Sequence, residues 1–267
     1  MSSRPLVHFA HATGFPGACY QRFFKALGDD IDIIMIPRLG HDPRFPIAGN
    51  WHRLADEVAE SVRRQSDGRP VIGLGHSLGG MTSFMAAYRQ PDLFRGLILM
   101  DPAYINPARA MVMGWYKLIG RIDDITPAGR SLGRREVWPS RDEARATLRN
   151  KGLFRNFEDE CFEDYLRHGL SDCDEGVRLT YEAAREVEVF RNTPSDTWRY
   201  RRQLSIPRVL ITGETSEFKT RGTMHRLAAT QGVPLLETPG AHMFPFEQSA
   251  ATAALVREHI LRIHAGV

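Results

Sequence analysis

A serine in a glycine-framed turn is the residue of this chain best suited to nucleophilic chemistry. Ser77 is the centre of a GxSxG pattern over residues 75–79, after a short apolar run and before a stretch typical of a buried helix. A serine at such a turn takes up a strained backbone conformation, so the residues two before and two after it must lack bulk. Gly75 and Gly79 meet this need. The pattern predicts that the Ser77 hydroxyl projects above a sheet, with the Leu78 amide pointing where negative charge would develop.

A histidine far along the chain can supply the base that this serine needs. A serine hydroxyl is a weak nucleophile until a base removes its proton and an acid orients that base. His242 lies in a glycine-containing loop over residues 239–245, directly after the last expected strand. Such a loop would lie at the carboxyl edge of a parallel sheet, which is also the edge expected for Ser77. We therefore predict that His242 is the general base.

The elements that must position these residues alternate between strand and helix. Their strands are continuous apolar runs, which favour a parallel sheet covered by helices on both faces. The sequence thus predicts an α/β fold. The expected strands lie at residues 6–10, 31–36, 71–74, 97–100, 207–211 and 233–238.

Residues 104–203 have a different composition. They offer no convincing strand, several helical patterns and many aromatic residues. We interpret this block as a helical cap inserted into a core that is formed by residues 1–103 and 204–267. Most of its aromatic side chains would form the interior of the cap itself.

Here the chain resembles the α/β-hydrolase superfamily over nearly all of its length. The segment TGFPG at residues 13–17 is similar to the family's oxyanion loop, the GxSxG turn to its nucleophile elbow, and GAH at residues 240–242 to its histidine segment. RLGHD at residues 38–42 is similar to another family loop, and the block 104–203 lies where the family inserts a cap. The resemblance implies the α/β-hydrolase fold with a mostly parallel sheet. Only five residues precede the first expected strand, so we expect the sheet to lack the family's leading hairpin and to have about six strands, with the strand at 31–36 at an edge.

The resemblance also implies an oxyanion hole and an acid. The hole would be formed by the backbone amides of Phe15 and Leu78. Family members most often carry an aspartate at the position that holds Ser216 here, so the acid must come from elsewhere. Asp101, which ends a core strand, is the preferred candidate because strand ends fix geometry better than loops. Glu217 is the alternative, and Glu214 is a weaker third choice.

Composition excludes several other classes of protein. The net charge of +3 comes from scattered arginines without a basic run, so no nucleic-acid or polybasic membrane site is expected. Three dispersed cysteines suggest reduced thiols in the cytoplasm. We expect neither secretion nor a membrane span, because the first residues lack the pattern of a secretory leader and no apolar run is long enough to cross a membrane. No dinucleotide-binding or metal-ligand spacing stands out, so no cofactor and no metal are expected, and a homo-oligomer is left open.

The sequence therefore predicts a serine hydrolase that acts on a small-molecule substrate, a small to medium carboxylic ester, through an acyl-enzyme on Ser77. Hydrolysis of a thioester, or of a carbon–carbon bond in a diketone, would use the same serine and histidine. A hypothesis of another class is a ligand receptor without catalysis that is built on a hydrolase scaffold. Because one fold hosts many chemistries, these motifs specify the fold better than the substrate.

Overall fold

A six-stranded parallel sheet forms the centre of the molecule. The computed structural model describes residues 4–266, and its sheet has the strand order β2-β1-β3-β4-β8-β9. The α/β-hydrolase fold with about six strands is therefore confirmed, as is the edge position of the strand near residues 31–36. The strands are β1 (Leu6–Ala10), β2 (Asp32–Met35), β3 (Val71–His76), β4 (Phe94–Met100), β8 (Arg208–Gly213) and β9 (Leu235–Thr238).

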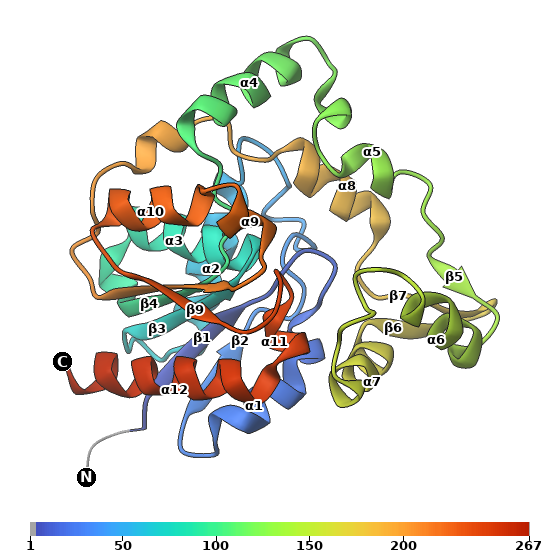
Figure 1. Cartoon of the computed structure of the whole chain (residues 1–267), viewed down its shortest axis with the longest axis horizontal. Coiled ribbons are helices and arrows are strands. Elements are labelled where there is room, and N and C mark those ends of the chain that lie inside the picture. Colours follow the sequence, from blue (N-terminus) through green and yellow to red (C-terminus); the bar gives the residue numbers. More distant parts are fainter. Residues whose placement is uncertain (1–3, 267) are drawn as a thin grey trace.

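Helices cover both faces of this sheet (Figure 1). Because residues of β1, β3 and β4 are buried on both faces, these strands read as nearly continuous apolar runs. One face is covered by α1 (Gln21–Leu27) and α12 (Ser249–Ala265), and the other by α2 (His52–Gln65), α3 (Leu78–Arg89) and α10 (Thr223–Gln231). The shorter helices of the core are η1 (Gly17–Tyr20), η2 (Pro91–Leu93), α9 (Glu217–Thr220) and α11 (Phe244–Glu247).

The register of the central strands brings their carboxyl ends to one edge. His76 of β3 pairs with Met100 of β4, and Met100 pairs with Ile211 of β8. The residues that follow, Ser77 and Asp101, therefore leave neighbouring strands at the same level. Loops at this edge of a parallel sheet are the usual place for a binding site.

Residues 104–203 leave the core after β4 and return to it before β8. Figure 1 shows this segment above and beside the sheet. The expectation that it lacks strands is wrong, because it contains a small antiparallel sheet in the order β5-β7-β6. Two to four residues per strand, with mixed polarity, were too short to produce a recognisable alternating pattern. Its elements are α4 (Pro107–Leu118), η3 (Ile122–Asp124), α5 (Ala128–Ser131), β5 (Val137–Trp138), α6 (Arg141–Arg149), α7 (Asp159–His168), β6 (Leu170–Cys173), β7 (Gly176–Leu179), α8 (Ala183–Arg191) and η4 (Thr197–Tyr200).

An aromatic cluster joins this segment to the core. The ring of Phe15 lies between 5.1 and 6.0 Å from the rings of Phe154, Phe157, Tyr165 and Phe246, measured between centroids. All five side chains are buried. Burying aromatic rings of this size contributes substantially to holding the segment against the core.

Within residues 4–266, no helix combines the length and the apolar character that crossing a membrane requires.

Candidate active site

The turn after β3 is built around two close backbone approaches. Ser77 has φ 53° and ψ −114°, in the positive-φ region that side chains rarely adopt. A Cβ on Gly75 would lie 2.5 Å from the Gly79 carbonyl oxygen, and one on Gly79 would overlap the carbonyl of Ala10. Only glycine allows α3 to start this close to β1 and β3. The turn thus holds Ser77 at the first turn of a buried helix, as its sequence pattern predicts.

Ser77, His242 and Asp101 form one hydrogen-bonded line. The His242 Nε2 atom lies 3.0 Å from Ser77 Oγ, and His242 Nδ1 lies 2.9 Å from Asp101 Oδ2. A carboxylate can only accept, so Nδ1–H donates to Asp101 and Nε2 is left to accept the serine proton. Asp101 is fully buried, whereas about a fifth of the His242 side chain is exposed. This arrangement can deprotonate the hydroxyl and stabilise the imidazolium that results.

Two hydroxyl groups that the sequence did not reveal hold Asp101 in place. Thr212 donates to Asp101 Oδ1 over 2.6 Å, and Ser216 donates to Asp101 Oδ2. Ser216 occupies the position where the family resemblance implies an aspartate, and here its hydroxyl donates to a carboxylate of the neighbouring strand. The backbone of Asp101 has φ 43°, in the positive-φ region that side chains rarely adopt.

Glu217 lies apart from this line. Its carboxylate pairs with Arg221 over 2.8 Å, and more than half of its side chain is exposed. It makes no hydrogen bond to His242 within the described chain, although it lines the same cavity. Glu214 is also exposed, and its side chain makes no hydrogen bond or ion pair with His242. Of the three acids considered from sequence, the structure places only Asp101 against the imidazole.

The two amides expected to form an oxyanion hole differ in their availability. Leu78 is the first residue of α3, and its amide has no acceptor among residues 4–266. The amide of Phe15, by contrast, donates to the Ala12 carbonyl over 3.1 Å. Because this tight turn engages Phe15, its assignment as a donor needs correction. The amide of Thr13, which also lines the cavity, makes no hydrogen bond to any described residue.

A buried histidine, His11, braces the loop that carries Thr13 and Phe15. It directly follows β1 and lies just before residues 13–17, the segment that resembles the family's oxyanion loop. The buried ring of His11 donates to the Ala12 carbonyl over 2.8 Å and accepts from the Leu39 amide over 2.8 Å. Burial lowers the pKa of His11 to about 4, so the ring stays neutral and can do both.

A second chain of hydrogen bonds links the three loops of the site. The Ala12 amide donates to the Tyr20 hydroxyl over 3.3 Å, Tyr20 donates to His76 Nδ1 over 2.8 Å, and His76 Nε2 donates to the His242 carbonyl over 2.9 Å. Burial, and then the neighbouring His242, lower the pKa of His76 well below its usual value. A neutral ring has one donor and one acceptor, and both are used here. His76 therefore ties the turn of Ser77 to the loop of His242.

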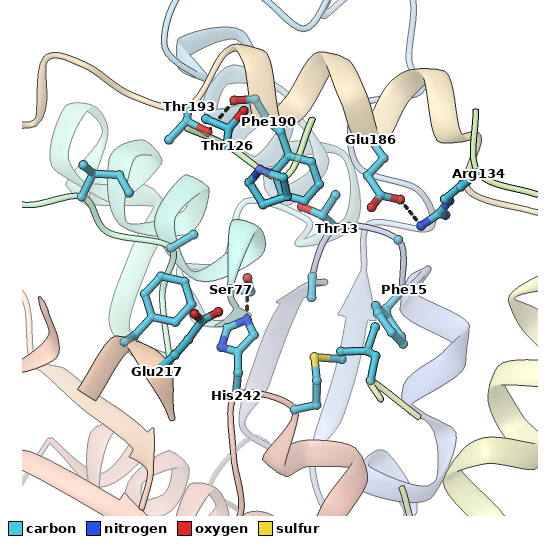
Figure 2. A pocket seen from close by; sticks show the side chains of 18 of the residues that line it. Thr13, Phe15, Ser77, Thr126, Arg134, Glu186, Phe190, Thr193, Glu217 and His242 are labelled. Carbon is cyan, nitrogen blue, oxygen red and sulfur yellow. Dashed lines mark hydrogen bonds and ion pairs between the residues drawn. The ribbon is translucent and has the colours of Figure 1, made fainter. Parts of the chain in front are cut away.

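These groups open into a cavity of about 380 Å³ between the core and residues 104–203. Figure 2 shows Ser77 and His242 pointing toward each other at one side of it. Much of the wall is apolar, and both parts of the chain contribute to it. Its apolar lining includes Trp51, Met113, Trp138, Leu148, Leu153, Phe154, Leu179 and Phe190. No cluster of three or more histidine, cysteine or acidic side chains suited to a metal ion occurs in the described part of the chain.

Comparison with known families agrees with this fold. The model of the alpha/beta hydrolase family matches residues 9–255. The chain belongs to this family. It is therefore an alpha/beta hydrolase in fold, and its relatives support the hydrolase class.

Individual relatives of this hydrolase are distant. It is 30% identical to a type I acyl-CoA thioesterase of Penicillium roqueforti over 131 residues, which are 46% of this chain and 28% of that protein. It is 23% identical to a 2-(acetamidomethylene)succinate hydrolase of Mesorhizobium japonicum, over 92% of this chain and 84% of the relative. A crystal structure of E-2-(acetamidomethylene)succinate hydrolase superposes with a TM-score of 0.76 at 22% identity, covering 96% of this chain and 91% of the other. The chain spans less than a third of the Penicillium relative's length.

Proposed function

We propose that this hydrolase cleaves a carboxylic ester or thioester through a covalent acyl-enzyme on Ser77. The observation that carries the proposal is the line from Ser77 Oγ through His242 to Asp101, which opens into a largely apolar cavity. An apolar wall fits the acyl chain of such a substrate. We include thioesters with esters as a substrate class because several relatives are named as acyl-CoA thioesterases.

The proposed reaction proceeds in two acyl transfers. His242 takes the proton of Ser77 while the serine oxygen attacks the substrate carbonyl carbon, and His242 then gives that proton to the departing alcohol or thiol. The amides of Thr13 and Leu78 would donate to the carbonyl oxygen as it gains negative charge. Each such donor is typically worth about 3 kcal/mol of transition-state stabilisation. Water activated by His242 then hydrolyses the acyl-enzyme.

We assign residues 104–203 as the cap over this reaction. The segment contributes much of the cavity wall, including Met113, Trp138 and Phe154. By excluding water it would strengthen the electrostatic interactions around the reacting carbonyl. In this proposal the substrate is a small molecule and the enzyme works in the cytoplasm.

Labelling with a fluorophosphonate probe tests the nucleophile. We expect the wild type to be labelled and Ser77→Ala to be unlabelled, with His242→Ala labelled far more slowly because its serine lacks a base. Equal labelling of wild type and Ser77→Ala would assign the reactive group elsewhere. Turnover of p-nitrophenyl hexanoate and of the hexanoyl thioester of N-acetylcysteamine would then rank the ester against the thioester. Tight ligand binding without any turnover would instead support the receptor hypothesis.

A further inference from the structure

The cavity has more positive than negative side chains in its wall. Arginines and one lysine contribute five cationic groups, whereas only two carboxylates line it. Each carboxylate already has a partner among these cations: Glu186 pairs with Arg134 over 2.6 Å, and Glu217 pairs with Arg221 over 2.8 Å. The cations are Arg109, Arg134, Arg135, Lys151 and Arg221.

Lys151 stands among like charges. It has no acidic partner among residues 4–266, and burial together with the nearby Arg134 and Arg135 lowers the pKa of its ammonium group. Arg135 pairs with Glu143, which lies outside the cavity wall. The wall thus carries Arg134, Arg135 and Lys151 against one lining carboxylate, Glu186, and this excess of positive charge favours a negative group there.

The neighbouring Trp138 has a donor without an acceptor. Its side chain is fully buried and lines the cavity, and its Nε1–H has no hydrogen-bond partner in the described chain. The Arg135 guanidinium lies 5.5 Å from the centre of the Trp138 ring, which places the indole beside the cationic group. The Nε atom of Arg134 is likewise buried without a partner. Buried donors are costly to leave unpaired, so both groups call for an acceptor that the described residues do not supply.

We propose that Arg134, Trp138 and Lys151 form an anion pocket that binds a compact oxyanion of the substrate. The inference rests on the proposed function, because it names a feature of the molecule that Ser77 would attack. Figure 2 shows Arg134 and Glu186 together, apart from Ser77 and His242, so the anion would lie away from the scissile carbonyl. Glu186 is the one lining carboxylate beside Arg134: its Oε1 accepts from the Ser131 hydroxyl over 3.0 Å, and its Oε2 pairs with Arg134 in charge but accepts no hydrogen bond among the described residues.

Two different parts of a substrate can carry an oxyanion that this pocket would bind. It can be a carboxylate at the far end of the acyl group, or a phosphate on the leaving group. Both present oxygen atoms that accept from an ammonium, a guanidinium and an indole N–H.

Paired substrates that differ only in charge test the anion pocket. The acyl arm compares p-nitrophenyl half-esters of adipate, pimelate and suberate with the corresponding terminal amides, which are neutral and nearly the same size. The leaving-group arm compares hexanoyl thioesters of phosphopantetheine and of N-acetylcysteamine. The readout is the ratio of kcat/KM for the anionic member to that for the neutral member.

We expect wild type to prefer the anionic member in one of the two arms, which identifies the source. Lys151→Gln should reduce that ratio about tenfold, as losing one charge-assisted hydrogen bond would. Trp138→Phe, which keeps an aromatic side chain but removes the N–H together with the fused five-membered ring, should reduce it several-fold. Lys25→Gln removes an exposed lysine of α1 outside the cavity, and it should leave the ratio within about twofold of wild type.

The outcomes separate this inference from the proposed function. If the neutral substrates are hydrolysed but wild type prefers the anionic member in neither arm, the anion pocket is wrong and the hydrolase proposal stands. A preference that survives in Lys151→Gln and Trp138→Phe also overturns the pocket. If wild type hydrolyses none of the substrates and no fluorophosphonate labels Ser77, the proposed function itself fails.

Discussion

Asp101 illustrates how single residues set up the proposed chemistry. A fully buried carboxylate is costly unless hydrogen bonds compensate for its lost hydration. Thr212 and Ser216 provide two of these bonds and His242 the third. Because the hydroxyls fix the carboxylate, the imidazole has one favourable orientation, with Nε2 toward Ser77.

Replacing each candidate acid in turn tests whether Asp101 or Glu217 orients His242. Asp101→Asn would present an amide that donates to Nδ1 and so favours the wrong tautomer of His242. We expect kcat for ester hydrolysis to fall by about 10³–10⁴, as in other enzymes with a serine, histidine and aspartate. Glu217→Gln, which loses only the exposed pair with Arg221, should stay within about threefold of wild type. Steady-state kinetics with circular dichroism as a check on folding measures both, and the reverse order of effects would reassign the acid.

Residues with a local signature were predictable, and those that act through long-range contacts were not. The glycines around Ser77 and the loop of His242 are recognisable in the sequence because the backbone geometry of these turns requires those residue types. Ser216 is an ordinary serine in the sequence, and its bond to Asp101 depends on how β4 lies beside β8. The engaged amide of Phe15 depends on a turn whose residues do not identify it. The roles of Ser77, His242 and Asp101 stay predictions until activity is measured.

At the scale of elements, the site depends on how closely α3 approaches the sheet. The helix starts immediately after β3, and its second residue, Gly79, lies against the end of β1. The Gly79 amide donates to the His11 carbonyl over 3.1 Å, which joins the turn of Ser77 to the loop of Thr13. One close contact thus sets the distance between Ser77 and both proposed oxyanion donors.

The substitution Gly79→Ala should push the start of α3 away from the end of β1. The added methyl group would overlap the Ala10 carbonyl, which is backbone and cannot move aside cheaply. We expect a loss of about 2–4 kcal/mol in the free energy of unfolding, within the range for overpacked or strained sites. Urea denaturation measures it. Gly152→Ala is the matched control, since a Cβ there meets nothing within 4 Å and should change stability by less than about 1 kcal/mol; equal effects of the two substitutions would contradict the close-approach argument.

The core strands were predictable from the sequence, whereas the small sheet within residues 104–203 was not, and the difference has a physical reason. Core strands such as β1 and β3 are buried on both faces, so their apolar runs stand out from the sequence. The small sheet β5-β7-β6 has strands of two to four residues whose pairing is set by the surrounding segment. Local propensity carries little information over so few residues.

At the scale of the whole molecule, several buried titratable groups make stability depend on pH. His8 and His11 are fully buried at the centre of the fold, and burial lowers the pKa of each to about 4. Glu57 acts in the opposite direction, because burial raises its pKa to about 7. The dependence of the free energy of unfolding on pH is therefore a sum of opposing contributions. Comparing wild type with a variant that lacks one titratable group isolates the contribution of that group.

His8→Gln isolates one histidine from this sum. His8 has a folded pKa of about 4 and an ordinary value of 6.5, so the unfolded chain binds its proton first as the pH falls. The stability that neutral His8 permits is complete above 6.5 and is lost as the pH decreases toward 4, by up to about 3 kcal/mol. Glutamine cannot take up this proton, and its amide can replace the bond of His8 Nε2 to Ser61, 2.9 Å away.

We therefore compare the free energy of unfolding of wild type with that of His8→Gln, by urea denaturation at each pH. The difference, wild type minus variant, should decrease as the pH falls from about 7 to about 4.5. His225→Gln changes an exposed histidine on α10, and its difference from wild type should be the same at both pH values. Subtraction cancels the contributions of His11 and Glu57, which both proteins share. A wild-type minus His8→Gln difference that stays constant, or grows as the pH falls, would mean that His8 is charged in the folded protein and that the sheet interior is hydrated around it.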